Sequence, residues 1–471
     1  MSLEGFKAAA IAANRFGYGA RPGELVEAEP DPRGWLLAQV RAPYRPPPAI
    51  EGLASSREVI ATFLAAREAR EAARKRAGGD PVKAIVDTVR EQVLPHYVRQ
   101  AAARTHATLA SPASFRERLV QFWSNHFAVS IDKPICLGTA GPLENEAIRP
   151  RIDGHFRELL LAVEMHPAMI TYLDNQQSVG PNSEFARRAG RRHFGAPKNP
   201  PGLNENLARE ILELHTLGVD GGYSQADVTT FAAVLTGWSI GGGRGRLAEG
   251  PAGAFVFRPA VHEPGSKTVL GRRYADGGYE QGRQVLADLA RHPATARHLA
   301  TKLARHFAGD EPPAAMVERL ARAYTGSDGH LPSVYAALVG SDEAWAEEPR
   351  KFKTPAEFVY SSLRALALDP EDPKKLLAGF EVLGQRHFSP GSPAGWPDRA
   401  ADWDGADALM KRVEFSVALA ERVGNAYSAI ASADACLGPL CGEHTRVALT
   451  RASSGTQALA LLLMSPEFQR R

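Results

Sequence analysis

The sequence predicts a mainly α-helical protein: a large multi-helix globular domain with at most one small β-hairpin, near residues 254–274. Apolar residues recur at helical spacing in segment after segment, and several of these segments begin at a residue that can cap a helix. Long alternations of apolar and polar residues, which are typical of strands, do not occur in the sequence. We therefore expect no central sheet.

The overall composition is that of an ordinary globular protein. Of the 471 residues, 44% are hydrophobic and 23% charged, which argues against wholesale disorder, and the net charge of +3 is too small to indicate a nucleic-acid partner. No segment approaches the roughly 18 apolar residues of a membrane span. The apolar run 8–13 is too short for a signal peptide. The sequence therefore predicts a soluble protein without a membrane span, located in the cytoplasm.

The three cysteines do not form a disulfide scaffold or a zinc pattern. Cys436 and Cys441 flank Gly438 and Pro439, which could turn the chain so that the two thiols meet. Two free thiols suit a cytosolic chain better, and both alternatives remain open.

The first hundred residues contain mostly helical patterns. Residues 3–40 are expected to form two helices around a turn, and a proline-rich connector follows at 42–48. Residues 55–76 are rich in Ala, Glu and Arg and have strong helix propensity. An amphipathic helix is expected over 83–110, with a kink where Pro95 removes a backbone donor.

The segment 114–127 is predicted to be a core helix because it carries four aromatic residues. Ser114 and Glu117 stand in capping-box positions at its start. Asn125 and His126 lie at its end among large apolar neighbours. A core histidine with satisfied hydrogen bonds and a ligand or acid–base histidine are both open interpretations of His126.

The next segments lead to the most informative helix. In the predicted helix at 143–150, Asn145 and Arg149 share one face. A further apolar helix is expected at 156–163, and residues 176–202 are expected to form a long surface loop.

A helix is predicted over residues 204–217, with Asn204 as its N-cap and Gly218 as a left-handed residue after its end. At about 100° per residue, its polar residues fall on a stripe roughly 100° wide, and most of the remaining surface is apolar. A helix buried on most sides, with its stripe facing charged partners or a polar cavity, explains this pattern. The residues of the stripe are Asn206, Arg209, Glu210 and Glu213.

The second half of the chain begins with a predicted helix whose capping box is Ser224 and Asp227. A glycine-rich loop at 241–245 lacks the features of a phosphate-binding loop. The hairpin follows, with its turn expected at Pro264-Gly265. Helices then dominate to the end, and His298 and His306, about 12 Å apart on one helix, are expected at the surface. These patterns divide the chain into 1–50 (helical segment and connector), 51–240 (helical core), 241–280 (loop and hairpin) and 281–471 (C-terminal helices).

Several of these stretches also match the motifs of one bacterial family. The matching stretches are 14–19, 122–127, 204–218, 235–238, 262–271 and 392–397, together with Gly221, Tyr223 and Asp227. Over nearly its whole length the chain resembles the family catalogued as domain of unknown function 1800, and Asn-x-Asn-x-x-Arg-Glu at 204–210 is its most specific motif. The resemblance implies a largely α-helical fold and a frequent gene neighbour from a secreted, phosphatase-related family, but no activity. The family usually has His-Asp where this chain has His262-Glu263.

The separated polar groups suggest one functional site. We expect Glu210, Glu213, His126 and Arg209 to be its catalytic residues, with Glu210 and Glu213 facing inwards against Arg149, Arg209 or His126. The helix at 204–217, the helix end at His126 and the segment at His262 are expected to converge on one pocket, lined by Trp123 or Trp238. The expected binding residues are Asn125, Asn145, Arg149, Asn204, Asn206, Trp238 and Lys267.

Two chemistries and one non-catalytic role fit such a site. His126, Glu210, Glu213 and His262 could hold a divalent metal ion that activates water, or the glutamate pair could act as general acid and base. Either would make the protein a hydrolase. The alternative is a scaffold that binds an exported phosphatase-like partner or a surface polymer. Export as the passenger of such a partner is the alternative to a cytoplasmic location.

Overall fold

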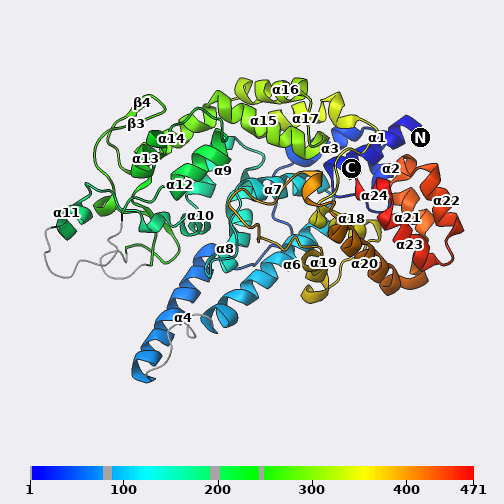
Figure 1. Cartoon of the computed structure of the whole chain (residues 1–471), viewed down its shortest axis with the longest axis horizontal. Coiled ribbons are helices and arrows are strands. Elements are labelled where there is room, and N and C mark those ends of the chain that lie inside the picture. The colour runs from blue at the N-terminus through cyan, green and yellow to red at the C-terminus, as the bar shows by residue number, and fades with distance from the viewer. Residues whose placement is uncertain (1–2, 78–86, 191–201, 243–248) are drawn as a thin grey trace.

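The computed structural model describes residues 3–77, 87–190, 202–242 and 249–471, and confirms the mainly α-helical fold. Figure 1 shows an elongated assembly of helices, from which α4 and α6 project side by side. The first helices are α1 (Leu3–Ile11), η1 (Ala12–Phe16), α2 (Glu24–Ala28), α3 (Pro32–Arg41), α4 (Ser56–Ala77), η2 (Val89–Val93), α6 (Leu94–Ala110) and α7 (Ser114–His126).

The middle of the chain consists of short helices, several of them π-helical or 3-10. They are α8 (Cys136–Pro142), η3 (Leu143–Ile148), η4 (Arg149–Arg151), α9 (Phe156–Glu164), α10 (Pro167–Tyr172), η5 (Asn175–Gln177), α11 (Glu184–Gly190), α12 (Asn206–Glu210), η6 (Ile211–Thr216), α13 (Gln225–Leu235) and η8 (Pro259–Val261). The expected loop at 176–202 thus contains α11, and residues 191–201 lie outside the described part.

The remaining chain is helical apart from its connecting loops. Its helices are α14 (Tyr279–Arg291), α15 (Pro293–Ala308), α16 (Ala314–Gly326), α17 (Leu331–Val339), η9 (Asp342–Trp345), α18 (Pro355–Ala365), α19 (Pro373–Val382), η10 (Ala400–Asp402), α20 (Ala406–Val423), η11 (Gly424–Ala426), α21 (Ala429–Cys436), η12 (Gly438–Leu440), α22 (Glu443–Arg451), α23 (Gly455–Met464) and α24 (Pro466–Gln469). None of the helices in the described ranges is both long and apolar enough to cross a membrane.

The described strands form two small antiparallel pairs instead of one hairpin. Strand β1 (Trp238–Ile240) pairs with β2 (Phe255–Phe257), and β3 (Lys267–Val269) pairs with β4 (Arg272–Tyr274). The tight turn lies at Leu270-Gly271, where both residues have positive φ, and not at Pro264-Gly265. A two-residue hairpin turn of this type needs positive φ at both central positions, and proline cannot adopt it.

The predicted caps form in part. Ser224 and Asp227 make the capping box of α13. Asn204 Oδ1 accepts the backbone N–H of Asn206 at 2.9 Å, but Glu205 is the N-cap residue of α12 and makes no side-chain cap hydrogen bond. Ser114 makes no cap hydrogen bond, because Ala113 is the N-cap of α7 and its carbonyl accepts the N–H of Glu117 at 3.1 Å, while the Glu117 carboxylate binds Arg149.

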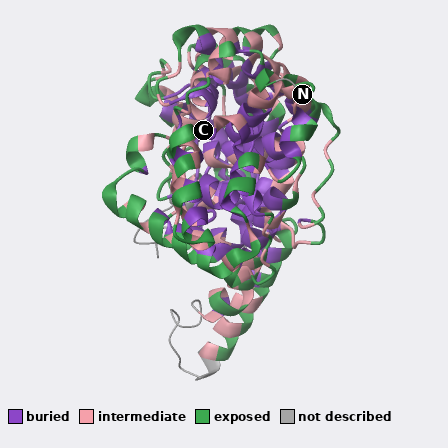
Figure 2. Ribbon diagram, turned by 90° about the vertical axis from the view of Figure 1, so that its right-hand side faces the viewer, coloured by how far each residue is buried: buried purple, intermediate pink, exposed green. Residues whose placement is uncertain are grey.

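The described core contains two large apolar clusters and two small ones. The largest joins residues from Ala12 to Phe388, including Trp123 and Phe307, and the second largest packs α18–α24 against Tyr18 and part of α6. Figure 2 shows the buried residues concentrated in the body of the molecule, whereas the projecting end is largely exposed. The four regions expected from composition remain a prediction.

Several charged side chains are buried with this apolar core as ion pairs. Arg149, 1% exposed, donates to Glu117 at 2.9 Å and to Glu144 at 3.0 Å, and Arg104 also pairs with Glu144 at 2.9 Å. Arg364 donates two 2.8 Å hydrogen bonds to Glu24. The pairs Arg149–Glu117 and Arg364–Glu24 connect helices that are far apart in sequence, so these charges act as fixed cross-links in the core.

We expect Arg149→Met to lower the free energy of unfolding by about 3–5 kcal/mol, because Glu117 would remain buried without its partner. Urea denaturation measures the change. The matched control is Arg283→Met, which removes the exposed pair with Glu280 and should cost less than about 0.5 kcal/mol. A loss below 1 kcal/mol for Arg149→Met would show that Glu117 is not dependent on this arginine.

Candidate functional site: a polar cavity at the end of α7

A polar cavity of about 110 Å³ lies where the end of α7 meets α15, the start of α18 and the loop 385–398. The wall is partly apolar, with Phe122, Phe127 and Phe388 among its residues. The charged and hydrogen-bonding residues that matter for its chemistry are Asn125, His126, Lys302, His306, Glu357 and Asp398.

Asn125 fixes the loop that closes one side of the cavity. Its Oδ1 accepts the N–H of Trp396 at 2.7 Å and its Nδ2 donates to the Trp396 carbonyl at 3.0 Å. Gly395, with φ of +85°, lies so close that a Cβ there would be 2.4 Å from the Asn125 carbonyl oxygen. Only glycine fits this position, so the close contact with α7 explains why residue 395 is a glycine.

His126 is held as a neutral imidazole with one free acceptor. Its Nε2 lies 3.1 Å from the backbone oxygen of His215, and because a carbonyl only accepts, Nε2 carries the proton. His126 is 1% exposed and its Nδ1 has no hydrogen-bond partner in the described residues. Burial, and then the charge of Lys302, hold the pKa of His126 well below its usual range. An unused lone pair is therefore buried at the cavity.

Lys302 adds an unpaired cation to the same cavity. It lies on α15 between His298 and His306, one turn from each, and its ammonium makes no hydrogen bond or ion pair within the described ranges. Burial lowers the pKa of Lys302 to about 8, although the charge of Asp398 opposes the shift. Among the described residues, the cavity is thus lined by a donor, the Lys302 ammonium, and an acceptor, His126 Nδ1, that have no hydrogen-bond partner.

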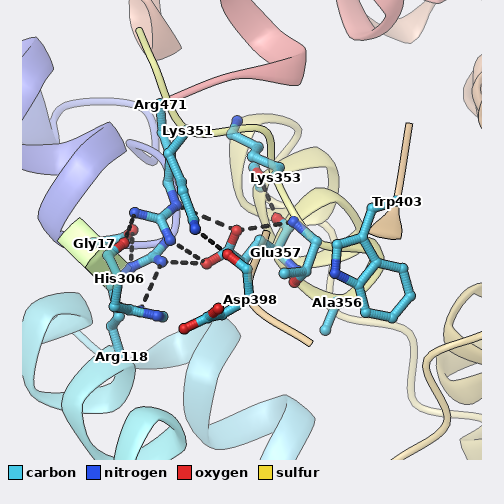
Figure 3. A network of polar contacts seen from close by, with 12 residues as sticks. Gly17, Arg118, His306, Lys351, Lys353, Ala356, Glu357, Asp398, Trp403 and Arg471 are labelled. Carbon is cyan, nitrogen blue, oxygen red and sulfur yellow. Dashed lines mark hydrogen bonds and ion pairs between the residues drawn. The ribbon is translucent and has the colours of Figure 1, made fainter. Parts of the chain in front are cut away.

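Below the cavity, the carboxylate of Glu357 is shared by two arginines (Figure 3). Arg118 from α7 donates to Oε1, and Arg471 Nη2 donates to the same oxygen at 2.7 Å. Oε2 accepts the N–H of Thr354, which completes the capping box of α18. Burial raises the pKa of Glu357, but Arg471 and Arg118 outweigh it and hold the pKa well below its usual range.

His306 lies between this network and the cavity. Its Nε2 faces Arg118 Nη1 at 3.4 Å, and its backbone oxygen accepts from Arg471 at 2.7 Å. Burial and the two guanidinium groups keep the pKa of His306 well below its usual range. The expectation that His298 and His306 lie at the surface is not met: His298 packs on His126 at 6.1 Å between ring centroids, and His306 packs on Phe122 at 5.3 Å.

The polar stripe predicted for the helix at 204–217 does not line this cavity. Asn206 is exposed, while Arg209, Glu210 and Glu213 are half-buried. Arg209 forms a 2.9 Å ion pair with Glu205, four residues earlier, and Glu213 accepts a 3.3 Å hydrogen bond from Tyr223. Glu210 accepts no hydrogen bond in the described part of the chain, and burial raises its pKa. The expected contacts of the two glutamates with Arg149, Arg209 or His126 are not formed.

The helix changes geometry in the middle of the motif, which explains the difference. Regular α-helix ends at Glu210, and the π-helical turn η6 contains Glu213 and His215. A π-turn has more residues per turn than the α-helix and shifts every later side chain around the axis. His215 consequently points into the core, where Nδ1 lies 2.8 Å from Glu164, and both side chains are fully buried. This pair was not predicted, although His215 interrupts an otherwise apolar surface.

The other predicted binding residues have structural partners. Asn145 donates to Gln100 at 3.0 Å, Asn204 donates to backbone oxygens after α10, and Arg149 is bound as described. Lys267 donates to the Glu263 and Gly265 carbonyls and to Gln281. Trp238 is fully buried beside Phe255 and Tyr279. None of these five side chains, nor Trp123, lines the cavity.

The predicted metal site is not assembled. His262 Nδ1 donates to the Thr236 carbonyl at 2.8 Å, and Glu263 binds the backbone and side chain of Asn182 at 2.8 and 2.7 Å. Within residues 3–77, 87–190, 202–242 and 249–471, no three His, Cys, Asp or Glu side chains are grouped to hold a metal ion. His126 therefore belongs to the cavity, whereas Glu210, Glu213 and His262 do not. Cys436 and Cys441 are free, buried thiols.

Lys353, near the Glu357 network, provides a test of these buried charges. Its ammonium lies 4.2 Å from the centre of the Phe468 ring without a hydrogen-bond partner among described residues, and burial lowers its pKa to about 7. We expect Lys353→Met to stabilise the protein on the order of 2 kcal/mol at pH 6. Between pH 7 and about 10 the unfolded chain keeps a proton that the folded protein has lost, so wild-type stability should rise and the advantage of the variant should shrink. Denaturation at pH 6 and pH 9 measures both effects; an advantage that grows with pH would contradict the assignment.

Comparison with known proteins agrees with the near full-length resemblance of the sequence. A family model described as "Protein of unknown function (DUF1800)" matches residues 11–470. No curated protein and no solved structure matches the chain. The match includes α7, α15 and the 392–397 loop, and therefore all elements that form the cavity. The chain belongs to the DUF1800 family.

Proposed function

We propose that the cavity at the end of α7 binds a small molecule that carries a carbonyl, carboxylate or similar oxygen together with a hydroxyl group. The observation that carries this proposal is that two groups without a hydrogen-bond partner in the described residues belong to residues that line this cavity: the Lys302 ammonium and the lone pair of His126 Nδ1. A ligand oxygen would accept from Lys302, and a ligand hydroxyl would donate to His126.

The energetic cost of leaving these groups unpaired supports a ligand or bound water at this position. A buried polar group without a hydrogen bond costs about 1–3 kcal/mol, and a buried charge costs more. Most other buried polar groups nearby are satisfied, as the contacts of Glu357 and Asn125 illustrate. Unused groups that share one cavity are typical of binding sites.

Hydrolysis remains a prediction, but the residues that we propose for it differ from those expected from the sequence. The glutamate pair and the metal set expected from sequence do not reach the cavity. In the cavity, Lys302 and Asp398 would be the acid–base pair, because an ammonium with a pKa of about 8 can donate and regain a proton near neutral pH. A scaffold for an exported phosphatase-like partner or a surface polymer is the competing proposal, and it requires no ligand in the cavity.

Ligand-observed NMR with glycolate and acetate tests the binding site. Both carboxylates should bind the wild-type protein, and glycolate should bind roughly 2–10 times tighter because its hydroxyl can donate to His126. Lys302→Met should weaken both about 10-fold or more, because a charge-assisted hydrogen bond is lost.

Lys353→Met is the matched control, since Lys353 also has no hydrogen-bond partner in the described residues but does not line the cavity. Its affinity for glycolate should equal that of the wild type. Absence of binding to the wild-type protein, or equal losses in the two lysine variants, would contradict the proposed site and favour the scaffold.

A further inference from the structure

The surroundings of Lys302 differ from those of other lysines in the described chain. Lys267 donates to three oxygens, Lys351 donates to Asp310 and to the Asp398 carbonyl, and Lys133 donates to Asp174 and two carbonyls. Lys353 lacks such a partner but packs on Phe468 away from the cavity. Lys302 combines an unengaged nitrogen with access to a cavity, which is the geometry that a nucleophilic amine requires.

We propose that Lys302 captures a small aldehyde or ketone covalently, as an imine. This inference rests on the proposed function and specifies the ligand as a carbonyl compound. The Nζ lone pair attacks the carbonyl carbon, a C–N bond forms, and the carbonyl oxygen becomes the hydroxyl of a carbinolamine. The C–O bond then breaks, and the oxygen leaves as water with the two hydrogens that the amine nitrogen carried.

The state of the amine supports this step. With a pKa of about 8, about one tenth of Lys302 is neutral at pH 7, whereas an ordinary lysine is neutral in fewer than about one molecule in a thousand. Burial is the largest cause of the shift, and the apolar side chains of Phe122, Phe127 and Phe388 line the same cavity.

His126 can hold the carbinolamine intermediate by a hydrogen bond without exchanging a proton itself. Its Nδ1 is an acceptor because Nε2 donates to the His215 carbonyl, and burial keeps the ring neutral. The carbinolamine hydroxyl is a donor that matches this acceptor. A carbonyl ligand can therefore engage both groups. Lys302 attacks its carbonyl carbon, and His126 Nδ1 accepts a hydrogen bond from the hydroxyl that this attack creates.

Reductive trapping of the full-length protein tests the imine. The protein is incubated with propanal and sodium cyanoborohydride at pH 7, where hydride reduces an imine to a stable secondary amine, and the modified lysines are identified by peptide mass spectrometry. Lys302 should be alkylated at least 10-fold faster than the exposed Lys374. Lys353, buried outside the cavity, should react more slowly than Lys302. Labelling of Lys302 at or below the rate of Lys374 would overturn the inference.

Lys302→Arg separates this inference from the proposed function. Arginine does not form an imine with propanal, so the variant should lose trapping at position 302, whereas the loss of glycolate binding in Lys302→Met tests the cation by a separate measurement. Circular dichroism melting verifies that the variant is folded. Glycolate binding that depends on a cation at 302, without fast trapping of Lys302, leaves the proposed function standing and overturns the imine. Failure of both glycolate binding and trapping in the wild-type protein overturns both.

Discussion

The ionised carboxylate of Glu357 is the interaction on which the surrounding structure depends. It caps α18 through Thr354, and it pairs with Arg118 of α7 and Arg471 beyond α24. Three elements far apart in sequence therefore share one anion in the interior. Because a buried charge is far less costly when it is paired and hydrogen-bonded, this arrangement constrains where α7 and α18 can lie. The position of the cavity between them follows from that constraint.

The same network explains why the chemistry of the cavity depends on Lys302. Arg118 and Arg471 are both engaged by Glu357, and His306 beside them is kept neutral by burial and by their charges. Asn125 is used to hold the loop at Trp396. After these contacts are made, the ammonium of Lys302 and the Nδ1 of His126 line the cavity without a hydrogen-bond partner among the described residues. The proposed binding site uses these two groups.

The sequence predicts Asn125 and His126 as site residues, and both line the cavity, whereas the helix at 204–217, expected to form the centre of the site, does not. His126 and Asn125 were identified because polar residues ended an aromatic helix, and both lie at the cavity. Lys302 was missed, although it lies four residues from His298 and from His306 and the three basic residues therefore share one face of α15. This four-residue spacing is the feature of the sequence that could have identified Lys302. The stripe at 204–217 was placed with regular α-helical geometry, and η6 invalidated that geometry after Glu210.

Local patterns in the sequence determined the mainly helical fold, the capping box at Ser224, the hydrogen bond that Asn204 accepts from the N–H of Asn206 and the left-handed residue at Gly218, which has φ of +86°. These features depend on residues within one turn of each other, and neighbouring residues are known from the sequence alone. Only the tertiary structure decided which charges are paired. Glu117 binds Arg149 instead of forming a capping box, and His215 pairs with Glu164. Lys302 has no partner in the described residues. The free energy of a buried charge depends on partners supplied by distant segments, and the pattern of a single helix contains no information about them.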